Sequence, residues 1–283
     1  MDSRLIGGAS LAKRLRSISI YAAIYVGCLG VFLTGARHGL WILAVTYVVR
    51  FLGTSIGYHR YFSHRSFQTY RFVQFLIGVW ATLGFQRGIL WWAQTHRDHH
   101  RNADTESDLH SPAHQGFWYA YCGWFFQHAN LATNYDRIRD FASFPELRWL
   151  DSDTGIVLIG LSYSGFLYWF WGWEGIVWGV CVSTVMCWQM VHWIQSVSHS
   201  WGGYRRFDSP DSSRNHWLLG VVTFGEFHNN HHAFPSSAKQ SFAWWEPDLG
   251  YRFLKLLEAL NLVWNVKSVR VGSPVYDAVK QTA

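Results

Sequence analysis

The sequence contains few charged residues for its length. Asp, Glu, Lys and Arg make up 15% of its 283 residues, whereas 49% are hydrophobic. Disordered chains have the opposite balance, so the composition excludes disorder. The net charge of +6 suits an anionic lipid surface, but so low a density of charge argues against nucleic acid as a partner.

Cysteine is also scarce, and no pair of cysteines has the spacing of a known site. The four cysteines are scattered and form no C-x-x-C motif: Cys28, Cys122, Cys181 and Cys187. This excludes a disulfide framework, a thiolate zinc site and a built-in iron–sulfur centre. No His-Pro-Gly-Gly signature of a fused cytochrome b5 occurs either, so any electron supply must come from another protein.

Aromatic residues are abundant, and they favour a membrane. The chain has 18 Trp, 14 Tyr and 20 Phe, residues that concentrate at the boundary between water and lipid. Four apolar runs approach the ~20 residues that a spanning helix needs, and none contains a proline: residues 18–36, 39–58, 155–173 and 175–197. We therefore expect an all-α integral membrane protein with four transmembrane helices in two hairpins. Arg50, inside the second run, is expected to snorkel to the nearer interface.

The remaining chain is expected to form a helical cap within one domain covering residues 1–283. Residues 72–86 are too short for a span, so they and residues 117–126 are predicted to lie along the interface. The basic N-terminus, which no cleavage site follows, places the cap on the cytoplasmic side. This cap comprises residues 59–150 and 198–283, and the helical spacing of leucines over 250–265 predicts a helix within it.

Histidine is the unusual residue of this chain, with 15 copies. Eight histidines form three clusters, and a ninth lies alone just after the fourth apolar run: His59/His64, His96/His99/His100, His228/His231/His232 and His199. Spacing i, i+3, i+4 puts three imidazoles on one face of a helix. The first pair is about 140° apart on an ideal helix, so we expect one member to lie where the helix leaves the membrane and unwinds. Nine imidazoles exceed what one ion accepts, which predicts two metals with four or five ligands each, and redox metals rather than a structural zinc pair.

These segments resemble the membrane-bound histidine-box fatty acyl desaturases of the stearoyl-CoA (Δ9) type. The resemblance covers residues 39–270 and is carried by GYHRYFSHRSF, WWAQTHRDHHRNADTESDLHSP, QSVSHSWG, HNNHHAFPSSA and WWEPDL. The H-x4-H interval of the first box favours a desaturase over a hydroxylase. The resemblance implies an enzyme that uses O2 and two external electrons to place a cis double bond in a long acyl chain.

The resemblance also implies a ligand set and partners. Two non-haem irons would be held by nine histidines: His59, His64, His96, His99, His100, His199, His228, His231 and His232. Gln195 stands where the family usually has an Asn that acts through a bound water. Gln86 and Trp92 fall where the family lines its acyl tunnel. The electron donor would be a ferredoxin or a cytochrome b5 with its reductase, and the enzyme would be a multi-pass membrane protein with a cytoplasmic active site.

The chain departs from the family at the residues with which the animal enzymes bind CoA. The charged pair before the second box is replaced by Gln94 and Thr95, and the Arg-Lys pair after the next Gly-Trp is replaced by Gln127–Ala129. The charged CoA-binding residues are therefore not present at these positions, and the identity of the acyl carrier stays open among CoA, a carrier protein and a membrane lipid. The motif before the third box, Gly225–His228, is also one Gly shorter than usual.

Other readings remain open from the sequence. A hydroxylase or an acetylenase uses the same scaffold, and from another class a non-catalytic metal- or haem-binding membrane protein also uses histidines, although a haem would need them inside the spans. Asp98 is expected to support the ligands or face solvent, and His110 to be a loop residue. The remaining histidines are assigned no role: His38, His114, His128, His192 and His216.

Overall fold

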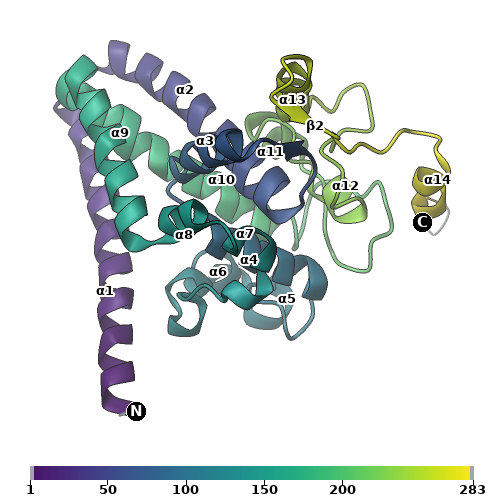
Figure 1. The fold of residues 1–283 in the computed structure, drawn as a ribbon, viewed down its shortest axis with the longest axis horizontal. Coiled ribbons are helices and arrows are strands. Elements are labelled where there is room, and N and C mark those ends of the chain that lie inside the picture. Colours follow the sequence, from purple (N-terminus) through teal and green to yellow (C-terminus); the bar gives the residue numbers. More distant parts are fainter. Residues whose placement is uncertain (1–2, 281–283) are drawn as a thin grey trace.

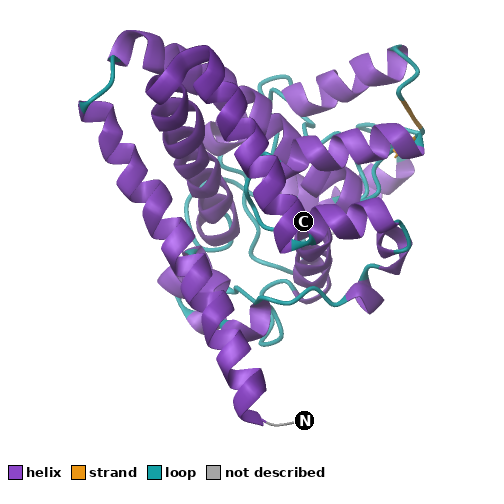
Figure 2. Cartoon of the chain, turned by 60° about the vertical axis from the view of Figure 1, so that its left-hand side comes forward, coloured by secondary structure: helices purple, strands orange, loops and turns teal. Residues whose placement is uncertain are grey.

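A computed structural model describes residues 3–280 and shows a mostly helical chain (Figures 1 and 2). The longer helices are α1 (Ser3–Cys28), α2 (Ala36–Gly53), α3 (Arg71–Thr82), α4 (Ile89–Asn102), α9 (Asp153–Glu174), α10 (Ser183–Val197) and α13 (Leu249–Ala259). The shorter helices are α5 (Pro112–Gln115), α6 (Phe117–Tyr121), α7 (Arg139–Ala142), α8 (Pro145–Asp151), α11 (Trp217–Val222), α12 (His228–Ala233) and α14 (Pro274–Lys280).

Narrower and wider helical turns extend several of these elements. The 3₁₀ helices are η1 (Leu29–Phe32), η3 (Gly123–Phe126), η4 (His128–Asn130) and η5 (Tyr135–Arg137), and the π-helices are η2 (Thr54–Ser63) and η6 (Gly175–Val182). Strands β1 (Gln68–Thr69) and β2 (Val263–Trp264) pair antiparallel with Gln68 opposite Trp264.

Three stretches of the described chain are long and apolar enough to cross a membrane: Arg14–Phe32, Ala36–Ser63 and Asp153–Val197. The third stretch folds back on itself at Gly172, whose φ of 53° and ψ of −138° are not helical. On either side of this reversal, the Tyr163 hydroxyl donates to the Gly179 carbonyl at 3.0 Å. The helices before and after Gly172 therefore pack side by side, while the count of four spans stays a prediction.

The second stretch is longer than expected and does not unwind at the first histidine box. Helix α2 continues as η2 to Ser63, where the His64 N–H donates to the His59 carbonyl at 3.2 Å. A bond across five residues is the π-helical pattern, and it brings residues five apart to the same face. The His59 and His64 ring centroids lie 4.9 Å apart. One member was predicted to lie where the helix ends, and His64 does follow the last helical residue, Ser63; between the two histidines, however, the chain widens into π turns instead of unwinding.

Arg50 does not snorkel, contrary to prediction. Its side chain is 0% exposed and donates to the Leu83 carbonyl at 2.7 Å. It also donates to the hydroxyls of Ser183 and Thr184 at 2.8 and 2.7 Å, and its guanidinium lies over the Phe85 ring. Because neighbouring helices supply these acceptors, the charge is stabilised inside the protein and has no need of the interface.

The short helix α3 lies within the segment that was expected not to cross the membrane. Its 12 residues span about 18 Å, against about 30 Å of hydrocarbon. Ile77 and Ala81 are buried against the core, while Phe72 and Leu76 are exposed. The two-sided pattern suits a helix that lies along a surface.

The core beneath the histidine boxes joins η2 to α4. Its fully buried members include Ile56, Tyr58 and Phe62 on η2 and Ile89 and Leu90 on α4. This packing sets the first two boxes against each other.

The helix predicted for residues 250–265 ends sooner. Helix α13 stops at Ala259, Leu260 is exposed, and Trp264 belongs to β2. The hydrophobic spacing therefore overstated the length of this helix by one to two turns.

Candidate metal centre

The nine box histidines come together in two groups. In each group, ligand-type atoms lie within 4.8 Å of one another. The first group has five members: His59, His64, His96, His100 and His231. The second has four members: His99, His199, His228 and His232. All nine histidines of the predicted set are accounted for, and the sizes match the predicted four or five ligands a metal.

The two box helices contribute to the groups in a reciprocal way. Helix α4 gives its i and i+4 histidines, His96 and His100, to the first group and the intervening His99 to the second. Helix α12 does the reverse, because His231 joins the first group while its i and i+4 neighbours join the second. The H-x-x-H-H spacing therefore serves two adjacent centres at once, rather than one centre for each box.

Imidazole nitrogens face one another within the groups. Nε2 atoms approach to 2.9 Å between His59 and His231, 2.8 Å between His64 and His96, and 2.7 Å between His199 and His228. In the second group, Nε2 of His99 and of His232 is buried and has no hydrogen-bond partner among residues 3–280. Imidazole nitrogens that face one another without hydrogen-bond donors between them can share a bound cation. This set of ligand atoms therefore suits a metal that prefers imidazole.

Acidic side chains hold the opposite edge of four imidazoles. Nδ1 atoms lie 2.6 Å from Glu226 for His59, 3.0 Å from Asp108 for His99, 2.9 Å from Asp104 for His199 and 2.8 Å from Asp211 for His232. A carboxylate at Nδ1 keeps that nitrogen protonated and leaves Nε2 free as the ligand atom. Asp104, Asp108 and Asp211 were not predicted from the sequence; for Asp104 and Asp108 the acidic run after the second box was the available signal.

His231 has an amide in the same position. When the Gln240 amide nitrogen donates to the Gly225 carbonyl at 3.2 Å and to Glu226 at 3.1 Å, its oxygen faces Nδ1 of His231 at 3.3 Å. A fifth imidazole is thus oriented with Nε2 towards its group.

Burial controls protonation at this centre. Burial and then the neighbouring His59 lower the pKa of both His64 and His96 well below the usual value, so these rings are neutral at pH 7. Burial alone would raise the pKa of Glu226, but the charge of Arg60 and contacts with His59 outweigh it and lower the pKa to about 2. Neutral imidazoles backed by ionised carboxylates are the protonation states that metal binding requires.

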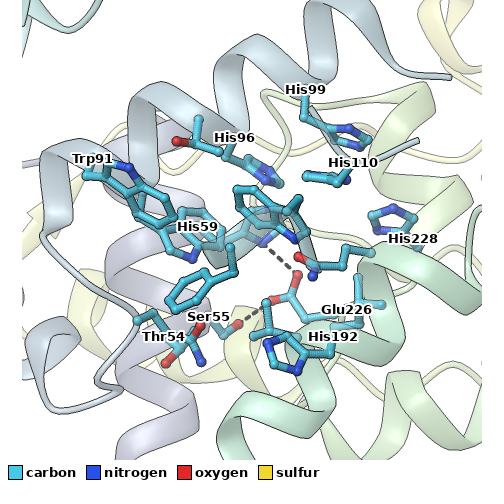
Figure 3. Close-up of a pocket in the computed structure, with 18 of the residues that line it drawn as sticks. Thr54, Ser55, His59, Trp91, His96, His99, His110, His192, Glu226 and His228 are labelled. Carbon is cyan, nitrogen blue, oxygen red and sulfur yellow. Dashed lines mark hydrogen bonds and ion pairs between the residues drawn. The ribbon is translucent and has the colours of Figure 1, made fainter. Parts of the chain in front are cut away.

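A cavity opens beside the two groups (Figure 3). Its lining includes His59, His96, His99 and His228 together with apolar and amide side chains. Both residues predicted to line an acyl tunnel are among them: Gln86 is buried with its amide nitrogen unpaired, and the Trp92 ring stacks on His96 with centroids 4.7 Å apart. An elongated apolar substrate in this cavity would lie directly against both groups.

Gln195 also lines the cavity, but its amide nitrogen is engaged elsewhere. That nitrogen donates to the carbonyls of Ala120 and Tyr121 at 3.1 and 2.8 Å. Only its oxygen is left to act through a water, so the predicted role of Gln195 stays a prediction.

His110 and Asp98 both lie near the second box, but only His110 contacts a box histidine. His110 lies in the turn after α4, is 5% exposed and stacks on His99 with centroids 4.5 Å apart. With Asp108 and His99 it forms a third group of possible ligands, although Asp108 already holds His99. Asp98 points away from the boxes and bridges Arg101 and Arg137 at 2.9 and 2.6 Å.

A polar cleft adjoins the cavity, and the two share Trp91 and Thr95. Gln94 also lines this cleft. Among its lining residues the only cation is Arg137, whose guanidinium is paired with Asp98. The side chain of His128 lies outside what the structure describes.

Comparisons with known proteins agree with this geometry. Residues 36–255 match the fatty acid desaturase family. The chain is 34% identical to the sn-1 stearoyl-lipid 9-desaturase of Anabaena variabilis, over 87% of this chain and 91% of that protein. It is 34% identical to Delta-9 acyl-lipid desaturase 2 of Arabidopsis thaliana, over 81% and 74% of the two chains. It is 31% identical to the acyl-CoA C20 Delta5-desaturase of Anemone leveillei, over 90% and 84%.

Proposed function

The chain belongs to the fatty acid desaturase family and is an oxidoreductase that desaturates fatty acyl chains; from that premise we propose that it does so with two iron ions held by its nine box histidines. The observation that carries the proposal is the division of these histidines into groups of five and four. Neutral imidazole is a common ligand for iron, and the count exceeds what one ion accepts.

The overall reaction removes two hydrogens from neighbouring methylenes and reduces O2 to two waters. The acyl chain supplies two electrons and two protons, and an external donor with solvent supplies the other two of each. Methylenes carry no group for acid–base catalysis, so O2 is the oxidant and bound iron would supply the redox chemistry that activates it. The protein then has to place the chain and exclude water. Trp92, stacked on His96, gives the cavity an apolar wall at the first histidine group.

The acyl chain is proposed to arrive as part of a membrane lipid. CoA carries several negative charges, and the cleft beside the cavity offers one cation, which is already paired with Asp98. Asp98 and Asp136 in the same lining would repel phosphates. Two of the relatives named above are acyl-lipid desaturases and one is an acyl-CoA desaturase, so the relatives allow both forms, and the charge of the cleft favours lipid.

We propose four spans with the histidine groups on the cytoplasmic side. Boxes on both sides of α3 contribute to the same groups, which argues that α3 does not cross the membrane between them. The basic N-terminal helix then favours the cytoplasmic face. Since the sequence has no haem or iron–sulfur motif, the electron donor would be a separate protein of the ferredoxin or cytochrome b5 type.

The test combines metal analysis with lipid analysis. Protein purified after growth with added iron should contain two irons, and expression in a bacterial host should create a cis-unsaturated fatty acid absent from the control strain. A folded, active preparation with one iron or none would refute the two-iron proposal. A hydroxylated or acetylenic product would instead show that the chain acts as a hydroxylase or an acetylenase on the same scaffold.

The carrier is tested separately, by offering the same acyl chain as a phospholipid, a CoA ester and a carrier-protein thioester. Turnover of the phospholipid alone is expected. Tight, salt-sensitive binding and fast turnover of the CoA ester would refute the lipid proposal.

A further inference from the structure

One edge of the first histidine group is accessible away from the substrate cavity. His64, His96 and His100 are only half-buried, unlike His59 and His231 of the same group. The cavity is lined by His59 and His96 but not by His64 or His100. The group therefore has two accessible sides, one facing the cavity and another at His64 and His100.

Three stretches far apart in the sequence meet next to His64. The Lys267 N–H donates to the Ser66 carbonyl at 2.8 Å, and the Ala238 N–H donates to the Lys267 carbonyl at 2.8 Å. Residues 64–67, 265–271 and 237–240 are thereby held side by side. We call these three stretches the basic edge.

The basic edge carries four cations and no carboxylate: Arg65, Lys239, Lys267 and Arg270. Lys267 and Arg270 are exposed, and neither they nor Lys239 has a carboxylate partner among residues 3–280. Arg65 follows His64 directly and lies 3.7 Å from Asp140, which is already bound by Arg97. The potential at this edge is therefore positive and only weakly compensated.

We infer that the basic edge is the docking surface for an acidic one-electron carrier protein, with electrons entering the centre through His64. The inference rests on the proposed function, which needs two electrons from outside for each double bond. Opposite charge would steer the carrier to the edge and orient it. The covalent path is short, because Arg65 on the edge is the chain neighbour of His64 in the first group. The substrate cavity is lined by His59 and His96 and not by His64, so the two partners would contact different members of the group.

An anionic membrane surface is the competing occupant of a cationic patch. The accessible imidazoles argue for the protein carrier, because electron transfer requires contact close to the metal ligands, whereas binding to a lipid surface does not. The experiment below separates the two.

The test reverses charge at the edge and measures reduction by a defined carrier. Lys267→Glu and the double variant Lys267→Glu/Arg270→Glu are compared with Arg14→Glu, a matched single reversal on α1. Figure 1 shows α1 and α14 on opposite sides of the molecule. Pre-reduced plant-type ferredoxin and cytochrome b5 serve as acidic donors, and stopped-flow absorbance follows their oxidation by the iron-loaded protein at low and high salt.

At low salt, the second-order rate constant should fall about 10-fold for Lys267→Glu and about 100-fold for the double variant, with a weaker salt dependence. Arg14→Glu should react like the unmodified protein. Anaerobic reduction of the iron-loaded protein by dithionite, which needs no docking, should be unchanged in all variants, as should their iron content.

Unchanged rate constants in both edge variants would overturn the inference. It would also be wrong if these variants lost binding to vesicles containing phosphatidylserine but kept normal reduction rates, since the edge would then bind lipid. Failure of dithionite to reduce the unmodified, iron-loaded protein would instead refute the proposed redox-active iron centre on which the inference rests.

Discussion

Asp104 offers the sharpest test of the second histidine group, because one of its oxygens accepts three hydrogen bonds. Oδ2 accepts from His199 Nδ1 at 2.9 Å and from the Ser212 amide and hydroxyl at 2.7 and 2.6 Å. Burial would raise the pKa of Asp104, but the bonds and charge of His199, then those of Ser212, outweigh burial and lower it. The side chain is therefore ionised at pH 7, and it orients a predicted ligand.

Two substitutions at Asp104 should weaken metal binding by different amounts. Asp104→Asn keeps the shape and tolerates the local φ of 58°, but it exchanges charge-assisted bonds for neutral ones. That difference is about 1 kcal/mol, or about 5- to 10-fold in affinity. Asp104→Ala leaves the His199 and Ser212 donors unpaired at about 1–3 kcal/mol each, so affinity should fall about 100-fold or more.

The assay is a titration of the iron-loaded protein in detergent with a competing chelator, followed by metal analysis. One of two irons should leave at lower chelator concentration in the variants, and the other should leave as in the unmodified protein. Asp136→Asn is the control, since this carboxylate is exposed and bonds only Arg139. Equal affinities for Asp104→Ala and the unmodified protein would refute the role given to Asp104. Loss of both irons together would show that the groups do not bind independently.

Three further predictions concern the centre and its setting. His99→Ala should lose one iron and all desaturation, whereas His38→Ala, in the first turn of α2 where the side chain is exposed, should keep both irons and the activity; an active His99→Ala protein would contradict the ligand assignment. In a background with the natural cysteines replaced, Ser107→Cys should be labelled by an impermeant thiol reagent only in inverted vesicles and Arg37→Cys only in intact cells, and the same sidedness for both would refute the topology. Burial lowers the pKa of His232 to about 4, so between pH 6.5 and pH 4 the unfolded chain binds more protons than the fold; the thermal midpoint of the metal-free protein should therefore fall as pH drops through this range, and a constant midpoint would contradict neutral, buried imidazoles.

The histidine groups illustrate how much a pattern of residues can establish. Spacing i, i+3, i+4 puts three imidazoles on one side of a helix whatever surrounds it, and the number nine requires more than one ion. The kind of centre and its full set of candidate ligands were therefore predictable. The division into five and four was not, because it depends on how α4 and α12 approach each other.

The first histidine box shows where local rules fail. An ideal helix separates His59 from His64, and only the π-helical turn of η2 brings them together. A π-helix forms where tertiary contacts stabilise it, and no local propensity predicts it. The prediction that Arg50 snorkels was wrong for the same reason, since its hydrogen-bond acceptors belong to segments remote in sequence.

Hydrophobic length and ligand spacing are local properties of the chain, so the membrane character, the family and the candidate ligands could be predicted from the residues alone. The pairing of each carboxylate with its imidazole depends instead on how the chain packs. His199 and Asp104 are 95 residues apart, and His59 and Glu226 are further apart still. Any acidic residue of the cap was a possible partner on sequence grounds. The choice depends on packing between distant segments, which also leaves His64 accessible beside the basic edge.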